Sequence, residues 1–295
     1  MLSSLPSRLD AALDALLGAL ELERHGDDRF RAPPDARRSL PRVYGGQLLA
    51  QALVAAAATV TGKPPHSLHA TFVKAGTPGR PLDVAVDRLR DGRTMARRQV
   101  TVAEAGAPLL NAVVSFHEGG SEPDVTAPPP PTPPPEELPT LQDWAAELPP
   151  ELAAHGRHWI EQPPPVEFRM GEPPSFLGPP SNDPVRSHWI RAPRALGDDP
   201  VRHAALLAYA SDFLLMDMVF RAAFRDRPDA GGPGRANGLS LDHALWFHRP
   251  VRFDRWHLYT QEAPAVVGDR GLARGAIHDD AGRLVATAVQ EVLVL

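Results

Sequence analysis

One carboxylate lies inside one of the most apolar stretches of the chain, and this position suggests chemistry. Asp212 is flanked on both sides by apolar residues within Leu207–Met216, in a segment with helical character. Burying a charged group without a partner costs free energy, so an acid at such a position needs partners. Asp212 is therefore a helix-surface acid, an acid paired with a cation such as Arg202, or a functional carboxylate held near hydrogen-bond donors. Asp217 is a weaker candidate of the same kind.

Two uncharged polar residues occupy similarly unusual positions. Gln290 continues the otherwise apolar face of the last predicted strand, Leu284–Leu293, because alternate residues of a strand share a face. Ser240 opens the stretch Ser240–Pro250, which mixes a hydroxyl, a carboxylate and two histidines with a dense apolar run. The alternatives are a position at the rim of the core for Gln290 and a loop or capping role for Ser240.

Gly45 and Gly46 precede a helix that is apolar on nearly all sides. Glycines at a helix start allow another backbone to approach closely, and the first N–H groups of a helix have no partner within it. Such a terminus can stabilise an oxyanion or an anionic ligand. The alternative is an ordinary turn before the helix.

Several other chemistries do not fit the sequence. The chain has no cysteine, so it has no thiolate nucleophile, and its histidines form no metal-binding motif. Gly238–Asp242 lacks the final glycine of a nucleophile elbow and leads into a strand instead of a helix, so Ser240 is not expected to act as a nucleophile. His243 and His248 are either core or surface histidines, or catalytic ones.

Composition limits the class of protein further. The chain has 295 residues and a formal net charge of −5, which argues against a nucleic-acid partner. Arg8, Asp10 and Asp14 interrupt the first apolar positions, so no signal peptide is expected there. The longest uncharged run, Tyr44–Gly62, contains glycine, glutamine and threonine and is typical of a buried helix, not of a membrane span. With no cysteine present, a cytoplasmic location is expected.

The first half of the chain predicts two helices followed by antiparallel strands. Apolar positions at helical spacing predict a helix over Leu5–Leu22, and a second helix is predicted over Tyr44–Val60. Alternating polar and apolar residues, with turn signals between them, predict the strands. These strands are Ser67–Lys74, Pro81–Arg90, Met95–Glu104 and Leu109–His117.

The second half repeats this pattern. A long apolar helix is predicted over Pro200–Arg225, and the loop Gly231–Gly238 leads into Ser240–Pro250, of which His66–Phe72 is a weaker copy. Strands follow over Trp256–Glu262, Gly271–His278 and Leu284–Leu293. Two matched units of this length indicate a duplicated domain and not a short-repeat solenoid.

The two units are separated by a stretch with a different composition. We predict an N-terminal domain over residues 1–118, a proline-rich linker over 119–184 and a C-terminal domain over 185–295. Residues 128–135 hold seven prolines and one threonine, which excludes a helix or an inner strand. A polyproline-II or disordered linker is predicted, with a ligand for an SH3-type domain as the alternative. Leu141–Leu148 is predicted to be a short helix.

From about Leu13 to the C-terminus, the sequence resembles the TesB-like family of acyl-CoA thioesterases (acyl-CoA thioesterase II). The motifs that carry the resemblance are Arg42–Gln47, His66–His69, Leu89–Gly92, Ser240–Pro250 and Val289–Glu291. The proline-rich middle and the loop Gly231–Gly238 depart most from the family. The resemblance implies an α+β double hotdog fold, in which two long helices are each wrapped by an antiparallel sheet and the sheets join side by side.

The resemblance also implies a function and a site. The function is hydrolysis of fatty acyl-CoA to a fatty acid and CoA, within fatty acid metabolism and without a metal or other cofactor. Asp212, Ser240 and Gln290 fall on the catalytic positions of the family, all in the second half. Substrate binding is expected at Gly45, Gly46, His66 and Arg93, with Arg88, Arg90, Arg97 and Arg98 as further candidates for the CoA phosphates. A homodimer or higher homo-oligomer is expected.

In the implied mechanism, Asp212 activates a water as general base while Ser240 and Gln290 fix that water. A backbone N–H near a helix start faces the developing oxyanion. Two alternatives remain at this point. One is a hotdog enoyl-CoA hydratase that uses Asp242 and His243 as its acid and base, and the other is a non-catalytic acyl-CoA binding protein.

Overall fold

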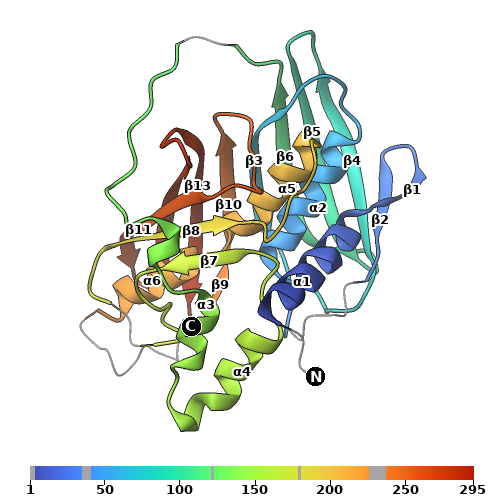
Figure 1. Ribbon diagram of the computed structural model, residues 1–295. Coiled ribbons are helices and arrows are strands. Elements are labelled where there is room, and N and C mark those ends of the chain that lie inside the picture. Colours follow the sequence, from blue (N-terminus) through green and yellow to red (C-terminus); the bar gives the residue numbers. More distant parts are fainter. Residues whose placement is uncertain (1–3, 35–40, 121–122, 179–180, 226–236) are drawn as a thin grey trace.

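The structure is a computed structural model that describes residues 4–34, 41–120, 123–178, 181–225 and 237–295. Its strands form one 13-stranded, antiparallel sheet (Figure 1). The strands of the first half are β1 Glu23–Gly26, β2 Arg29–Ala32, β3 Pro65–Phe72, β4 Leu82–Asp91, β5 Met95–Glu104 and β6 Ala107–His117. Those of the second half are β7 Glu167–Met170, β8 Val185–Arg191, β9 Gly238–Ser240, β10 Asp242–Phe247, β11 His257–Val267, β12 Arg270–Asp279 and β13 Leu284–Val294.

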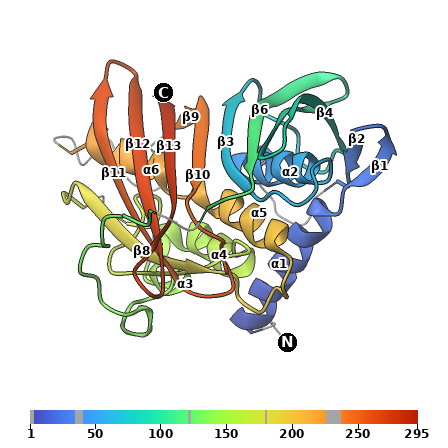
Figure 2. The ribbon, with the colours of Figure 1, turned by 90° about the horizontal axis from the view of Figure 1, so that it is seen from above.

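The two halves of the sheet have the same internal order. They meet where β3 pairs with β10, with Ala244 opposite His69. Outward from this junction the order is β3-β6-β5-β4-β2-β1 on one side and β10-β13-β12-β11-β8-β7 on the other. Figure 2 shows both halves flanking the junction. The predicted duplication and the side-by-side sheets are therefore confirmed.

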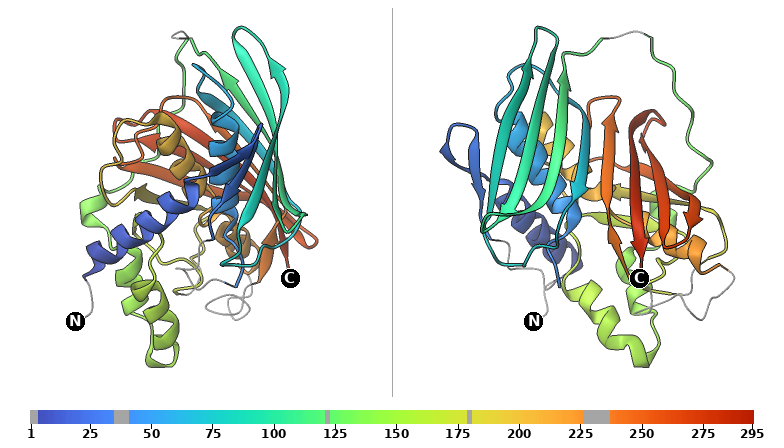
Figure 3. Two further views of the ribbon diagram at one scale, coloured as in Figure 1. Left: turned by 90° about the vertical axis from the view of Figure 1, so that its right-hand side faces the viewer. Right: turned by 180° about the vertical axis from the view of Figure 1, so that it is seen from behind.

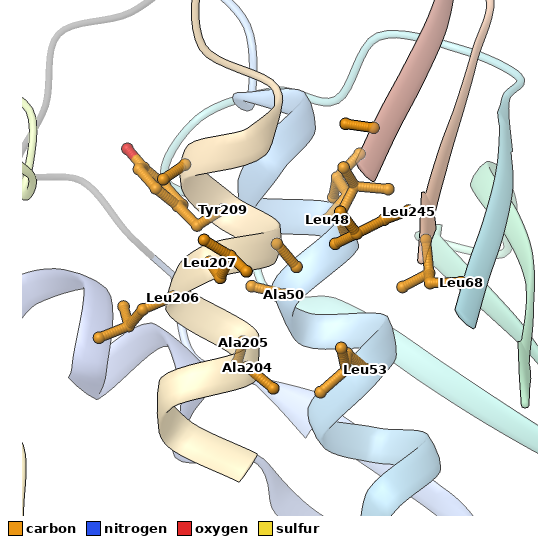
Figure 4. Close-up of a cluster of buried hydrophobic side chains, with 14 of the residues drawn as sticks. Leu48, Ala50, Leu53, Leu68, Ala204, Ala205, Leu206, Leu207, Tyr209 and Leu245 are labelled. Carbon is orange, nitrogen blue, oxygen red and sulfur yellow. The ribbon is translucent and has the colours of Figure 1, made fainter. Parts of the chain in front are cut away.

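Helix α2, Gly45–Ala57, is enclosed as its composition predicts. Leu49, Leu53 and Ala52 are fully buried, because α2 packs on strands β3–β6 and on helix α5, Pro200–Ser211. Figure 4 shows the two helices side by side, with small alanine side chains where they approach. Small side chains bring the backbones of α2 and α5 close together. Helix α1, Leu5–Leu20, packs on α2 and confirms the first predicted helix.

The prediction of one continuous helix over Pro200–Arg225 is wrong. Helix α5 ends at Ser211, and a separate helix α6 covers Leu215–Ala223. Between them Leu214 has a φ of 66°, in the left-handed region that a non-glycine residue rarely adopts and that stops a helix. Helix α5 therefore packs on α2, while α6 packs on β11–β13. The loop predicted over Gly231–Gly238 lies outside the described residues up to position 236.

Among the described residues, the stretch Pro200–Ala223 is long and apolar enough to cross a membrane by length and composition. In this protein 94% of its apolar window is buried inside the fold, as in the core helix of a globular domain.

The segment predicted to be a linker carries its own structure. Trp189 Nε1 donates to the Pro133 carbonyl oxygen at 2.8 Å, and Pro134 has the polyproline-II angles φ −63° and ψ 153°. The predicted short helix is confirmed as α3, Leu141–Ala146, and α4, Ala153–Glu161, follows it. Figure 3 shows this chain crossing from β6 to the α3–α4 hairpin at one end of the molecule.

Strand β7 lies within the predicted linker range, yet it pairs with β8 and occupies the place in the second half that β1 occupies in the first. The domain boundaries at residues 118 and 184 stay a prediction. The pairing of β7 leads us to propose that the second domain begins before Glu167.

Candidate functional site

The break between α5 and α6 is what positions Asp212. The carboxylate is at the C-terminal end of α5, 8% exposed, and its Oδ2 accepts the Gly46 N–H at 2.9 Å. Gly46 belongs to the first turn of α2, where N–H groups have no partner within the helix and the helix dipole favours a negative charge. The Gly46 N–H predicted to meet an anion therefore binds a carboxylate of the protein itself.

Close contacts at the start of α2 leave no room for a side chain at Gly45 or at Gly46. A Cβ on Gly46 would lie 2.2 Å from the Tyr209 carbonyl oxygen, and a Cβ on Gly45 would lie 2.8 Å from Asp212 Oδ2. Helices α2 and α5 thus approach so closely at this end that an ordinary side chain does not fit. The close approach brings Asp212, from the second half, to the start of the helix of the first half.

A buried chain of hydrogen bonds leads from α5 to Ser240. Ser211 Oγ lies 2.9 Å from His243 Nε2, and His243 Nδ1 lies 2.7 Å from Gln290 Oε1. The Gln290 amide nitrogen then donates to Ser240 Oγ at 2.7 Å. Because an amide oxygen only accepts, His243 carries its proton on Nδ1 in this arrangement. His243 thereby fixes which end of the Gln290 amide faces Ser240.

Burial controls the charge states in this cluster. It raises the pKa of the Asp212 carboxyl above its ordinary value, and His243, the Gly46 N–H and Gln290 offset only part of that increase. Burial also lowers the pKa of His243, despite the nearby Asp212 charge, so this imidazole is neutral at pH 7. The site thus combines a carboxylate of increased basicity with a neutral histidine.

A cavity of ≈ 700 Å³ brings the predicted residues together. Asp212, Ser240, Gln290 and Gly45 all line it. Its other lining is largely apolar, and includes Leu48, Phe72, Trp159, Phe176, Phe213, Leu214, Met216, Phe220 and Leu239. A carboxylate and two polar side chains on the wall of an apolar cavity suit an ester or thioester with a hydrocarbon chain.

His66 and Arg93, by contrast, do not line this cavity among the described residues. His66 bonds Ser115 Oγ at 2.9 Å near the start of β3, whereas the cavity is lined by Phe72 at the other end of that strand, roughly 20 Å away at ~3.3 Å per residue. Arg93 is exposed in the β4–β5 hairpin, at the His66 end of the sheet. Their role in substrate binding stays a prediction that the cavity does not support.

Two of the arginines considered for the CoA phosphates have structural partners instead. Arg98 is 1% exposed and donates to Thr59 Oγ1 at 2.7 Å and to Asp91 at 2.6 Å. Arg88 pairs with Asp28 through two hydrogen bonds of 2.6 and 3.0 Å. The cations that line the cavity among the described residues, Arg42 and Lys74, were not among the predicted phosphate-binding residues, although Arg42 is the first residue of the Arg42–Gln47 motif.

Hydrogen-bond partners decide two other predictions, the pairing of Asp212 with Arg202 and the role of Asp217. Arg202 donates to the Leu196 carbonyl oxygen at 2.8 Å, so the alternative in which it pairs with Asp212 is wrong. Asp217 is bonded by Arg186 and by the Ser175 backbone N–H. Asp217 also lines the cavity, with its carboxylate held by these two partners.

His243 is expected to act as a positioning residue, which a substitution tests. Removing its ring in His243→Ala frees the Gln290 amide to rotate, and misplacing a catalytic group can cost up to about 10²-fold in kcat. Steady-state kinetics on an acyl-CoA should show the loss in kcat with little change in KM. His69→Ala is the control, because His69 holds the matching place in the first half and is exposed on β3. Equal kcat values for the two variants would contradict the assignment.

Comparison with known proteins identifies the family of this chain. A family model described as the acyl-CoA thioesterase N-terminal domain matches residues 33–117, and one described as the C-terminal domain matches residues 125–294. Acyl-coenzyme A thioesterase 8 of Homo sapiens is 32% identical, with 86% of this chain and 80% of that protein covered. Acyl-CoA thioesterase 2 of Haemophilus influenzae is 31% identical, with 96% and 97% covered.

Solved structures of acyl-CoA thioesterases also match this chain. A tesB protein of Mycobacterium avium subs paratuberculosis superposes with a TM-score of 0.76 at 29% identity, covering 96% of this chain and 99% of that chain. The acyl-CoA thioesterase II of Mycobacterium marinum gives 0.74 at 30% identity, covering 96% and 98%. The expected double hotdog fold is thereby confirmed. With two domain models matching in order along most of its length, this chain belongs to the acyl-CoA thioesterase II (TesB-like) family.

Proposed function

We propose that this chain hydrolyses fatty acyl-CoA thioesters with a water held by Asp212, Ser240 and Gln290. The observation that carries the proposal is that these three side chains, from α5, β9 and β13, meet on the wall of one largely apolar cavity. A hydrocarbon chain fits the apolar lining, and the polar cluster supplies a base and two groups that orient water.

The reaction follows from the positions of the donors and acceptors. Asp212 removes a proton as the water oxygen attacks the thioester carbon, and the carbonyl oxygen gains the negative charge. Gly45 is the first residue of α2 and lines the cavity, so its N–H lies where it can stabilise that charge. When the intermediate collapses, the C–S bond breaks and the proton on Asp212 passes to the leaving CoA sulfur.

The hydratase alternative fits the structure less well. Asp242 and His243 are successive residues of β10 and point to opposite faces of the sheet. Asp242 accepts the Glu291 N–H at 2.8 Å, whereas His243 faces Ser211 and Gln290. They therefore do not form an acid–base pair around one substrate.

A thiol-release assay over a homologous series of acyl-CoAs tests the proposal. Release of CoA thiol from saturated acyl-CoAs supports hydrolysis. Loss of the conjugated absorbance of an enoyl-CoA without thiol release indicates hydration instead. Tight binding of acyl-CoA with neither change indicates the non-catalytic binding protein.

We propose that Arg42 and Lys74 bind the phosphates of CoA, because they are the cations of the cavity lining. An exposed ion pair contributes up to about 1 kcal/mol and 1.4 kcal/mol is tenfold, so Arg42→Gln with Lys74→Gln should raise KM by roughly ten- to thirtyfold. The KM for the acyl-pantetheine thioester, which lacks the nucleotide, should not change. Arg93→Gln is the comparison variant: a rise in its KM, with none for the double variant, would favour the position predicted from sequence.

We also propose a place in fatty acid metabolism, a cytoplasmic location and a homo-oligomeric state. The apolar cavity supports the first, and the lack of cysteine suits a reducing compartment. The molar mass in solution, measured by light scattering, tests the oligomeric state.

A further inference from the structure

Part of the cavity wall comes from the segment that the sequence predicts to be a linker. Trp159 on α4 and Phe176, in the loop between β7 and β8, both line the cavity, and both lie within residues 119–184. Their rings stack at 4.5 Å between centroids with an interplanar angle of 24°. We call this pair the aromatic wall. In the first half a single helix, α1, precedes β1, whereas the α3–α4 hairpin precedes β7 in the second half.

The aromatic wall is held rigidly in place. The neighbouring Ser175 donates its backbone N–H to Asp217 of α6 at 3.0 Å, and its hydroxyl bonds the same carboxylate. Asp217 is in turn paired with the buried Arg186 of β8. On the other side, His155 Nε2 lies 2.7 Å from the Phe176 carbonyl oxygen. Since these partners are largely buried, moving the loop would expose or unpair charged groups.

The surroundings of the wall indicate what it contacts. Helix α6 contributes Met216 and Phe220 to the lining of the same cavity, and Leu214 precedes them. Ser175 and Asp217 also line the cavity there, but they are bonded to each other, so the surface left for a ligand is mainly apolar and suits hydrocarbon. The cations of the described lining are Arg42 and Lys74. A stacked pair of large rings is a stiff boundary, because each ring blocks the rotation of the other.

We propose that the aromatic wall, Trp159 with Phe176, limits the length of the acyl chain that the cavity accepts. This inference rests on the proposed function, because it assigns the apolar part of the cavity to the acyl group. Each further methylene that finds room gains about fourfold in affinity from burial, and each one that meets the wall loses that gain. Trp159 on α4 and Phe176 after β7 thus determine the chain-length specificity, while Asp212, Ser240 and Gln290 supply the catalysis.

Truncating the wall tests the proposal. In Trp159→Ala and in Phe176→Ala, the maximum of kcat/KM over a series of saturated acyl-CoAs should move to a longer chain by two or more methylenes. Activity on the longer substrates should rise by about tenfold. Phe176→Leu should give a smaller shift in the same direction. Trp256→Ala is the matched control, because Trp256 packs under Arg191 away from the cavity. A gain on long substrates cannot arise from unfolding, and an unmoved maximum in all three wall variants overturns the proposal.

A binding measurement separates this proposal from the proposed function. Fatty acids of increasing length are used to displace a fluorescent fatty acid from proteins that carry Asp212→Asn. The affinities report which chain length the cavity prefers, without hydrolysis. Truncated walls should bind longer fatty acids more tightly, by about fourfold per added methylene. A wild type that releases no thiol from any acyl-CoA overturns the proposed function, and the binding series still decides the role of the wall.

Discussion

Replacing Asp212 by asparagine is expected to lower kcat for acyl-CoA hydrolysis by about 10²–10⁴-fold, with little change in KM. Asparagine has nearly the same shape and keeps an oxygen that accepts the Gly46 N–H, so the α2–α5 contact is preserved. What is lost is the ability to take a proton from water. Thiol release measures the change, and the thermal midpoint confirms that the variant is folded.

The matched control lies at the other end of the same helix. Asp199 caps the N-terminus of α5 by accepting the N–H groups of Val201 and Arg202. Because asparagine is an equally good cap, Asp199→Asn should retain full activity. Comparable kcat values for Asp212→Asn and the wild type would exclude Asp212 as the base.

The same role predicts a pH dependence. A general base acts when ionised, so activity is lost as the pH falls through the pKa of Asp212. Burial raises that pKa, which puts the acid limb of the profile at a higher pH than an ordinary aspartate gives. In Asp212→Asn this limb should disappear from the residual activity, since no carboxylate then titrates at that position.

Gly46→Ala is the substitution with the largest expected effect on stability. The added Cβ would lie 2.2 Å from the Tyr209 carbonyl oxygen and 2.5 Å from the Tyr44 ring. A backbone oxygen cannot rotate away, so α2 and α5 must separate, at a cost of about 1–3 kcal/mol or more. The Gly46 N–H moves away from Asp212 at the same time, so kcat should fall along with the thermal midpoint.

Gly18→Ala is expected to change the stability in the opposite direction. Gly18 lies within α1, and its Cβ would meet no described atom within 4 Å. Replacing a glycine inside a helix by alanine should stabilise the protein by about 0.5–1 kcal/mol, with activity unchanged. If denaturant unfolding shows that Gly46→Ala is as stable as the wild type, the close α2–α5 approach is not present in solution.

Much of the fold was predictable because its signals are local. Alternation of apolar residues marks β4, β5 and β13, and the near-repetition of β3 in β10 predicted the duplication. The break in the second helix was not predictable, because Asp212–Leu214 contains no glycine or proline, and its one weak helix former, Asp212, does not by itself end a helix. The left-handed Leu214 results from tertiary packing that overrides local preference. The bounds of β7 were not predicted, because prolines surround this four-residue strand and leave it little alternating pattern.

The candidate site was likewise predictable only in part. Asp212 and Gln290 were recognisable as polar residues among apolar neighbours, and this needs no three-dimensional information. The role of His243 depends on the register that puts Ala244 opposite Val289, so the pattern alone left it open. The aromatic wall lies in a segment with no periodic pattern, and only the cavity reveals its position.

Single-turnover hydrolysis in ¹⁸O-labelled water tests most directly whether water, activated by Asp212, attacks the thioester. With enzyme in excess over acyl-CoA, mass spectrometry of the released fatty acid reports the origin of its new oxygen. Direct attack by water predicts ¹⁸O in the acid from the first turnover. An unlabelled acid in the first turnover, with ¹⁸O in the enzyme, would show that the Asp212 carboxylate attacks instead and would contradict the proposed mechanism.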